Sequence, residues 1–508
     1  MSDSKNIKML FAGIILFYIL WQIGQFFYGE RVLAGGGFGW DGVQYATWVS
    51  QFSFRNYFQH QLSPYYIQRI LPSIIVHYIM VILHLNLQSH SAIINTFIVY
   101  NNVMLLFVML GLFSLAYFLR WTPAATLVAF VSLFFNFVLL KQLSYYSVLT
   151  DYTALTIGFF QLYCYIKKRV LFLYLLSIVG AFAWPTLLLS GFLLILFDAQ
   201  CFKKDYADSL IDFMKRNFSY KKCAAIFVLS VIFSVLFAAI CFFLYKMSPD
   251  HHKFLTLLNV LFSNISYGSI LPWWVVVSIF VVLIYVFFLV LPAGMLLLRA
   301  LSGLKRDFIF WIKLGLCVVF YGAIHFIVSH YSLHTIAEPG LSGFLFRFVF
   351  AIAAPGKFLA TYFIYFGLGA VLLVFLLPRI SFQDIAPLGI PYFLLLLIFA
   401  LQVHSRFGTP YFPLIALMIG TQLSKMKISF QFCLRYVLLA FVFSCAWIPL
   451  TWPGQSLNPT MAELHQWPWQ VYFATSGLWT TSFSYSIELV LMIIAGFLVY
   501  PLLKNKMD

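Results

Sequence analysis

Long apolar runs alternate with short polar segments along the whole chain. Many of these runs reach or approach the roughly 20 apolar residues that a helix needs to cross a bilayer. They are continuous, whereas the strands of a membrane barrel would alternate apolar and polar positions. The pattern therefore predicts an all-α, polytopic transmembrane helical bundle. The runs lie near residues 9–28, 70–87, 92–119, 124–140, 152–166, 170–183, 186–198, 223–245, 272–298, 309–330, 357–377, 389–403, 409–424, 432–450 and 487–503.

The basic residues between these runs indicate how the chain is threaded. If 70–87 crosses the membrane, the clusters at 167–169 and 203–222 fall outside. If 70–87 lies on the outer surface, nearly every basic cluster falls inside, as the positive-inside rule favours. Pro72, His77 and His84 also suit a juxtamembrane helix. We expect about 13–14 spans, both chain ends in the cytoplasm, and outer-face juxtamembrane helices after the first span.

The runs predict one integral-membrane domain over 1–508, without a separate soluble domain. Within it, 29–91 is expected to be the first outer loop with its juxtamembrane helices, and 451–486 the last outer loop. Residues 199–222 mix basic, acidic and apolar side chains, which is typical of a cytoplasmic amphipathic segment on anionic lipid. Trp184-Pro185 divides 170–198 into two short halves, which predicts a hairpin that does not fully cross.

Composition supports the membrane assignment and excludes other classes. The 508 residues are 63% hydrophobic and only 9% charged, and a soluble protein of this size could not bury that much apolar surface. The net charge of +16 does not indicate nucleic-acid binding, because the basic residues follow the predicted topology. The seven cysteines form neither a disulfide framework nor a metal-binding spacing.

Two carboxylates are candidates for chemistry at the outer face. Asp41 lies after the first run, between Trp40 and Gly42, and Asp151 lies where the run 152–166 begins. A carboxylate at such a position could accept a proton from a hydroxyl group. Each also has a structural alternative, since Trp-Asp-Gly suits a tight turn and Asp151 could cap a helix N-terminus.

Basic residues on the same face could bind an anion. Arg69, Lys141 and Arg406, with His404 beside the last, are the candidates. Snorkelling to lipid headgroups is the structural alternative, and it suits Lys141 best. A guanidinium binds phosphate well, and cations at headgroup depth could stabilise a departing lipid phosphate. Together with the carboxylates, they point to transfer from a polyprenyl-phosphate-linked donor.

This arrangement resembles the GT-C superfamily of integral-membrane glycosyltransferases. The resemblance rests on an acid in the first outer loop, a juxtamembrane Arg-x-x-Pro element, a second acid and a late Arg-aromatic element. The corresponding segments are Trp40-Asp41-Gly42 with Tyr45, Tyr65-Tyr66-Ile67-Gln68-Arg69-Ile70-Leu71-Pro72, Asp151, and His404-Ser405-Arg406-Phe407 with Pro410 and Pro413.

The resemblance implies an inverting transferase that moves a sugar from a polyprenyl-phosphate carrier to a glycan, lipid or protein acceptor. Asp41 would be the general base, and Asp151 would position the acceptor or help to hold a divalent ion such as Mg or Mn. Arg406 and Arg69, with Lys141 and His404, would hold the donor phosphate. The chain has no second acid next to Asp41, so the resemblance does not firmly imply a metal.

Four aromatic residues near these groups, Trp40, Tyr45, Tyr65 and Tyr66, could stack on sugar rings, although an interfacial aromatic belt has the same composition. The expected location is a bacterial inner membrane, with the site facing the periplasm or the outside. Two other functions stay open. One is a transporter or flippase for a lipid-linked or amphipathic solute. The other is a polysaccharide polymerase or ligase, for which Arg347 beside Glu338 would be the candidate site.

Overall fold

The structure is a computed structural model that describes residues 2–53, 62–197, 272–303, 308–332, 351, 354–451, 467–473 and 480–504. Over these residues the chain is helical, and its one bridge between extended segments joins Leu62 to Ser332. The predicted all-α class is confirmed for this part of the chain. The segments 199–222 and 223–245, most of 451–486, and Arg347 and Glu338 lie outside the described residues.

Five helices of the described chain are long and apolar enough to cross a membrane. The third of them continues through the π-helical turn η4 (Val286–Val290). The five are α1 (Ser2–Tyr28), α6 (His90–Phe118), α15 (Pro272–Tyr285) with α16 (Leu291–Gly303), α17 (Phe308–Tyr331) and α27 (Ser482–Lys504).

Two further candidate spans are bent pairs of helices. The pair α7 (Pro123–Phe134) and the segment Val138–Tyr145 bends by 61°, and the pair α19 (Lys357–Phe366) and Leu368–Arg379 bends by 119°. Gly367 sits at the second bend with a φ of 73°, a conformation that glycine adopts without strain. The described residues thus provide five spans, or seven with the bent pairs, where the apolar runs predicted about 13–14.

The run 223–245 lies outside the described residues, and within them many apolar runs fold into helices too short to cross alone. Helix α5 has 12 residues and is therefore about 18 Å long, against a hydrocarbon core of roughly 30 Å. A helix of this length does not cross the bilayer by itself, and its place at the outer surface stays a prediction. The run 170–198 forms two 11-residue helices that pack together, as Trp184-Pro185 indicated. The short apolar helices are α5 (Leu71–Ile82), α10 (Val170–Gly180), α11 (Thr186–Leu196), α22 (Ile390–Ala400), α23 (Pro413–Leu423) and α24 (Phe430–Phe443).

The remaining elements are short turns and the helices around the candidate site. They are η1 (Ala34–Gly37), α2 (Trp40–Gln51), α4 (Pro64–Ile67), η2 (Val138–Gln142), α8 (Leu143–Tyr145), α9 (Asp151–Ile166), α20 (Leu368–Leu376), η6 (Leu377–Arg379), α21 (Phe382–Ile385), η7 (Ala386–Leu388), η8 (Ser405–Gly408) and α26 (Trp469–Phe473).

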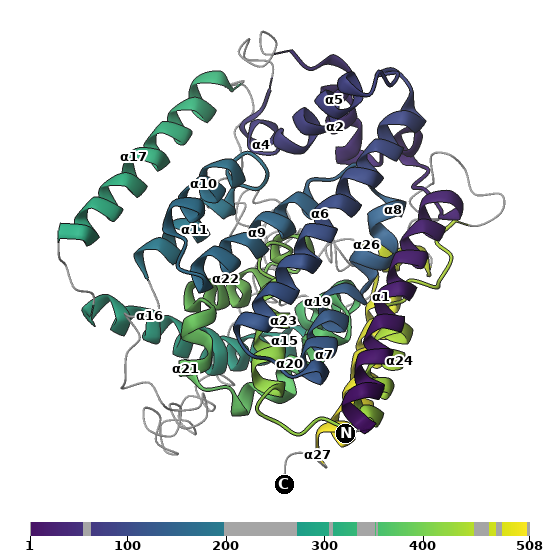
Figure 1. Ribbon diagram of the computed structural model, residues 1–508, viewed down its shortest axis with the longest axis vertical. Helices are drawn as coiled ribbons and strands as arrows, with labels where there is room; N and C mark the ends of the chain where they lie inside the picture. The colour runs from purple at the N-terminus through teal and green to yellow at the C-terminus, as the bar shows by residue number, and fades with distance from the viewer. Residues whose placement is uncertain are drawn as a thin grey trace.

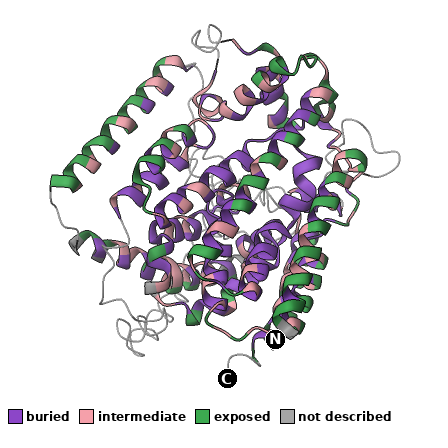
Figure 2. Ribbon diagram, viewed as in Figure 1, coloured by how far each residue is buried: buried purple, intermediate pink, exposed green. Residues whose placement is uncertain are grey.

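The helices form a bundle whose centre is buried and whose outer helices expose apolar side chains. Helices α7 and α23 pack closely at the centre, and α9 packs against α6 and α10 (Figure 1). Helix α17 stands apart at one edge, and α1 lies at the other beside α24. Figure 2 shows the contrast between this buried centre and the exposed sides of α1 and α17.

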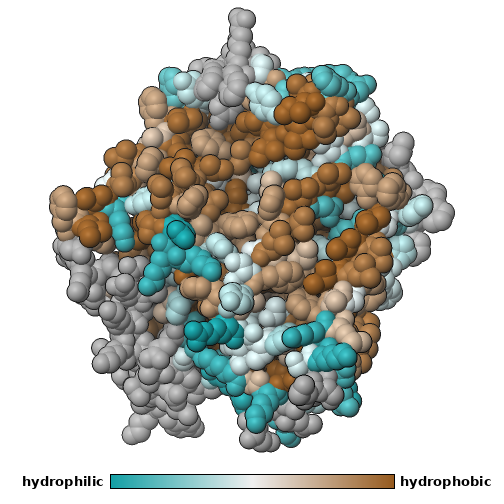
Figure 3. Space-filling view, viewed as in Figure 1, coloured by the Kyte–Doolittle hydropathy of each residue, from teal (hydrophilic) through white to brown (hydrophobic). Residues whose placement is uncertain are grey.

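Apolar side chains gather on the outside of the bundle, as expected for a surface in contact with lipid. Leu106, Phe107 and Leu110 on α6 and Leu171 and Phe172 on α10 are exposed, and hydrophobic surface covers this region in Figure 3. The helices α2, α4 and α5 lie at one end of the molecule, and α1 begins at the other end (Figure 1). The structure is thus that of a multi-pass membrane protein, with the first predicted outer loop far from the N-terminus.

Candidate functional site

A glycine fixes the start of the helix that carries Asp41. Gly39 has a φ of 75° and precedes α2, and a Cβ there would lie 2.2 Å from the ring of Tyr146. The backbone N–H of Gly42 donates to the Tyr146 hydroxyl over 3.4 Å. Asp41 therefore occupies the first turn of α2, where the positive end of the helix dipole favours a carboxylate. The alternative prediction of a tight turn is wrong.

A second close approach brings Arg406 near the helix of Asp151. Gly158 on α9 faces the residues after η8, and a Cβ there would lie 2.1 Å from the carbonyl oxygen of Pro410. Only glycine allows α9 and this segment to pack so closely. Arg406 projects from η8, the turn between α22 and α23, towards the N-terminus of α9.

Asp41, Asp151 and Arg406 form one charge cluster. The Arg406 Nε and Nη2 donate to the two oxygens of Asp151, each over 2.8 Å. Its Nη1 lies 3.4 Å from Oδ2 of Asp41. Burial lowers the pKa of Arg406, but the nearby carboxylates, Asp151 first, outweigh this effect and raise it well above its usual value. The guanidinium is a permanent cation that links two acids 110 residues apart in the sequence.

The two carboxylates differ in their exposure to solvent. The Asp41 side chain is 32% exposed, whereas the Asp151 side chain is 1% exposed. Asp151 is the first residue of α9, and neither it nor Thr150 makes a side-chain cap at this terminus. The alternative role of Asp151 as an N-cap is therefore wrong, since its oxygens accept from Arg406 instead.

The predicted tyrosines surround Asp41 in a chain of aromatic contacts. The Tyr65 hydroxyl donates to Asp41 Oδ2 over 3.3 Å, and its ring meets that of Tyr66 edge to face. Tyr66 in turn contacts Tyr45, which is 1% exposed. Trp40 is 47% exposed and stacks on Tyr472 of α26. Tyr65 is therefore the predicted aromatic residue that bonds the accessible carboxylate, and Trp40 is the one that is exposed.

Arg69 is a buried cation between two aromatic rings. Its guanidinium carbon lies 4.3 Å from the centre of the Tyr65 ring and 3.9 Å from that of Trp184. The side chain is 3% exposed, and its Nε makes no hydrogen bond to the residues that the structure describes. A bond from the N–H of Leu71 to the carbonyl of Phe182 holds this segment against the α10–α11 hairpin.

Sequence reasoning missed two residues of this site. It identified Trp184 only as a helix break, yet the ring is fully buried against Arg69 and Phe407. Tyr146 was part of the stretch before Asp151, but nothing in the pattern indicated that it packs on the start of α2. An aromatic residue next to proline at the centre of an apolar hairpin was the one signal available for Trp184.

The other two predicted phosphate ligands, Lys141 and His404, have contacts outside the charge cluster. The Lys141 ammonium is 2.5 Å from Glu30, which also accepts from the backbone N–H groups of Leu450 and Thr451. Lys141 thus supports a link between the segment after α1 and the segment after α24. His404 packs edge to face on Phe407, next to the η8 turn.

The donor set around Asp41 does not fit the Mg or Mn ion that the sequence left open. No group of three His, Cys, Asp or Glu side chains comes together among the described residues. More directly, the Arg406 guanidinium bridges the two carboxylates that would hold the ion. An ion between them would have to displace a bidentate, buried ion pair.

Comparisons with protein-family models, with curated proteins and with solved structures gave no match to this chain. The functional argument therefore depends on the geometry of the site.

Proposed function

We propose that the chain is an inverting glycosyltransferase that uses a polyprenyl-phosphate-linked sugar donor. The observation that carries the proposal is the convergence of Asp41, Asp151, Arg406, Arg69 and Tyr65 from four separate segments. These are the residues on which the resemblance to the GT-C superfamily rests. A purely structural ion pair needs neither an accessible carboxylate nor a buried arginine beside it.

Asp41 is the general base in this proposal. Its exposed fraction lets an acceptor hydroxyl approach, while Tyr65 and Arg406 hold the carboxylate in place. Asp41 takes the proton from the hydroxyl, and the acceptor oxygen attacks the anomeric carbon. The bond from that carbon to the phosphate oxygen breaks, and the lipid phosphate leaves with the electron pair. Asp41 then returns the proton to solvent.

Arg406 and Asp151 position this base. The Arg406 donors are directed at two carboxylates, so this residue is a poor ligand for a further anion. Asp151 is enclosed and accepts from Arg406, so it acts through the arginine. This differs from the roles expected from sequence, in which Arg406 held the phosphate and Asp151 the acceptor.

Arg69 is the better ligand for the donor phosphate. Among the residues that the structure describes, no carboxylate pairs with the buried Arg69 guanidinium; such burial is costly, and a bound phosphate would supply the missing charge. Tyr65 contacts both residues: the Arg69 guanidinium lies over the face of its ring, and Asp41 accepts from its hydroxyl, so the phosphate and the base would lie next to one ring. This geometry suits a displacement with base and leaving group close to the same carbon.

The test of the base is the variant Asp41→Asn in membranes supplied with a panel of polyprenyl-phosphate-linked hexoses and pentoses. We expect a product with the wild-type chain and loss of transfer with Asp41→Asn. Asp384→Asn is the matched control, since Asp384 lies on α21 and pairs with Lys425. Near wild-type transfer by an inserted Asp41→Asn chain would refute the role of Asp41.

The test of the phosphate ligand compares Arg69→Met with Arg435→Met, an exposed arginine on α24. Loss of charge-assisted hydrogen bonds of ~1.5–3 kcal/mol should raise the apparent KM for the donor about ten- to hundredfold. The control should leave the KM unchanged. An unchanged donor KM in Arg69→Met would assign the arginine to packing with Tyr65 and Trp184 alone.

A further inference from the structure

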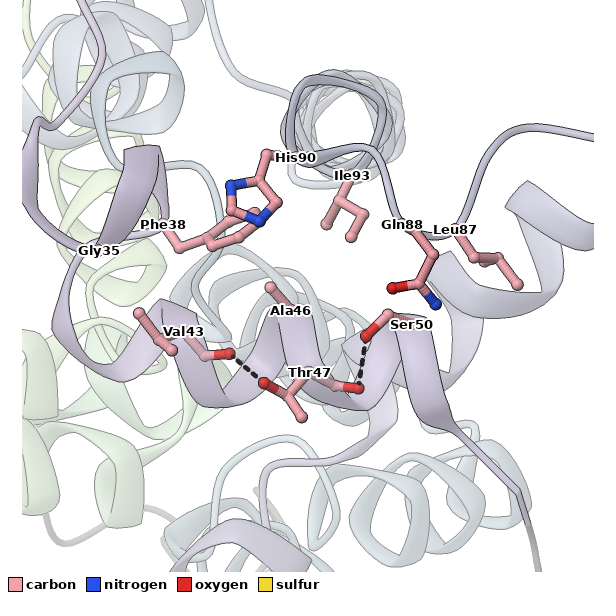
Figure 4. Close-up of a pocket in the computed structure, with 10 residues that line it drawn as sticks. All are labelled: Gly35, Phe38, Val43, Ala46, Thr47, Ser50, Leu87, Gln88, His90 and Ile93. Carbon is pink, nitrogen blue, oxygen red and sulfur yellow. Dashed lines mark hydrogen bonds between the residues drawn. The ribbon is translucent and has the colours of Figure 1, made fainter.

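A second feature of the outer loop is a cleft on the far side of α2 from Asp41. It has a volume of about 290 Å³ and lies between α2 and the start of α6 (Figure 4). Its floor is formed by Val43, Ala46, Thr47 and Ser50, which recur along one face of the helix. Asp41 projects from the opposite face, since it precedes Val43 by about 200° of helical rotation. The cleft is therefore separate from the charge cluster.

The floor of the cleft presents hydroxyl oxygens as acceptors. Thr47 donates its hydroxyl proton to the carbonyl of Val43 over 2.9 Å, and Ser50 donates to the carbonyl of Thr47 over 3.1 Å. These bonds use the protons and leave the oxygen lone pairs available. Both bonds are drawn in Figure 4, which shows the two side chains along the helix surface below the cleft.

The opposite wall presents an amide and an imidazole. Gln88 lies at one end of the cleft and His90 at the other (Figure 4). Neither side chain makes a hydrogen bond to another residue in the described part of the chain. His90 is held over the ring of Phe38, with the ring centres 4.6 Å apart. The two ring planes are inclined at 53°, and His90 is one of the polar side chains that line the cleft.

The chemistry of the lining selects an uncharged ligand with several hydroxyl groups. The ten described residues around the cleft include no Lys, Arg, Asp or Glu, so no permanent charge there favours a phosphate or a carboxylate. Apolar surface from Ala46 and Ile93 lies between the polar groups. A sugar ring matches this pattern, because its C–H faces are apolar and its edge carries hydroxyl groups. The volume lies just below the range of drug-sized ligand pockets, about 300 to 1,000 Å³, which suits a single ring.

We propose that this cleft is a binding site for one neutral sugar ring of a glycan. The hydroxyl groups of the ring would pair with Gln88, His90, Thr47 and Ser50, and an apolar face would lie on Ala46. The site goes beyond the proposed transferase reaction, since none of its residues belongs to the charge cluster. It would hold a glycan next to α2, the helix whose first turn carries Asp41.

The test measures binding of the methyl glycosides of glucose, galactose, mannose and N-acetylglucosamine to the purified full chain in detergent, by saturation-transfer NMR. We expect at least one glycoside to bind, and Gln88→Ala to weaken that binding about tenfold, or ~1.4 kcal/mol. Thr47→Phe should abolish binding by filling the cleft. Asn95→Ala is the matched control, because Asn95 is an exposed amide on α6 outside the lining.

Two outcomes would overturn the proposal. One is the absence of binding by every glycoside of the panel to a folded wild-type chain. The other is binding that survives both Thr47→Phe and Gln88→Ala, which would place the sugar elsewhere. The variant Asp41→Asn separates this proposal from the transferase function, since it should abolish transfer and leave binding in the cleft intact.

Discussion

Replacing Arg406 with methionine should destabilise the protein strongly, because it leaves Asp151 as a buried charge. Arg406 donates two hydrogen bonds of 2.8 Å to a carboxylate that is 1% exposed. Hydrogen bonds to charged groups contribute about 1.5–3 kcal/mol each, so the pair supplies at least ~3 kcal/mol. Breaking a buried ion pair by removing one partner costs ~3–5 kcal/mol, which agrees with this sum.

The assay is unfolding in mixed micelles by titration with sodium dodecyl sulfate, which yields a free energy of unfolding for each variant. Arg406→Met should lower it by ~3–5 kcal/mol, and the double variant Arg406→Met/Asp151→Leu should restore most of the loss, because no lone charge then remains. Lys425→Met is the control. Lys425 is 50% exposed and pairs with Asp384 at the surface, so its loss should cost at most about 1 kcal/mol.

Two results would refute this reasoning. A loss below about 1 kcal/mol in Arg406→Met would mean that water reaches Asp151. Failure of the double variant to recover stability would mean that Arg406 stabilises the fold by packing and not by neutralising Asp151. Sugar transfer should stay low in the double variant even when stability returns, since Asp41 then lacks its positioning residue.

Two more perturbations test the packing and the loop that support the site. Gly158→Ala should lower the free energy of unfolding by ~1–3 kcal/mol and separate Arg406 from Asp151, because the added Cβ would lie 2.1 Å from the Pro410 carbonyl oxygen. Gly13→Ala is the control, since a Cβ there would have no atom within 4 Å. Equal free energies of unfolding in the two variants would contradict the close approach. The second perturbation concerns the pKa of Glu30. Burial raises this pKa, but the hydrogen bonds to the carboxylate, that of Lys141 above all, lower it by more, so the net pKa lies below the usual 4.5. The contribution of Glu30 to stability is therefore present above that pH and is lost as the pH falls through the lowered pKa. Melting temperatures measured downward from pH 6 should fall less in Glu30→Gln than in wild type, and identical pH profiles would exclude the carboxylate as a cause.

The helical membrane fold and the charged residues of the candidate site could be predicted from the sequence. Apolar content and continuous apolar runs indicated helices, because only helices satisfy their backbone hydrogen bonds within one apolar segment. The scarcity of charged residues drew attention to Asp41, Asp151, Arg69 and Arg406, and the structure brings the first two and the last into one cluster.

The number of spans could not be predicted in the same way. An apolar run shows that a segment avoids water, but it does not show where a helix breaks. The bend of 119° at Gly367 depends on a backbone angle that a hydropathy pattern does not contain. The partner of each charged residue could not be predicted from the sequence either. Lys141 pairs with Glu30, 111 residues earlier, and Arg406 pairs with Asp151, 255 residues earlier.

By itself, then, the sequence determined that this chain is a helical membrane protein with a few charged groups available for chemistry, because composition and periodicity are local properties. The tertiary structure decided the surroundings of each group. It exposed Asp41 and enclosed Asp151, joined both to Arg406, and left Arg69 between two aromatic rings. Those differences depend on close approaches between distant segments, such as Gly39 on Tyr146 and Gly158 on Pro410, which no local pattern encodes.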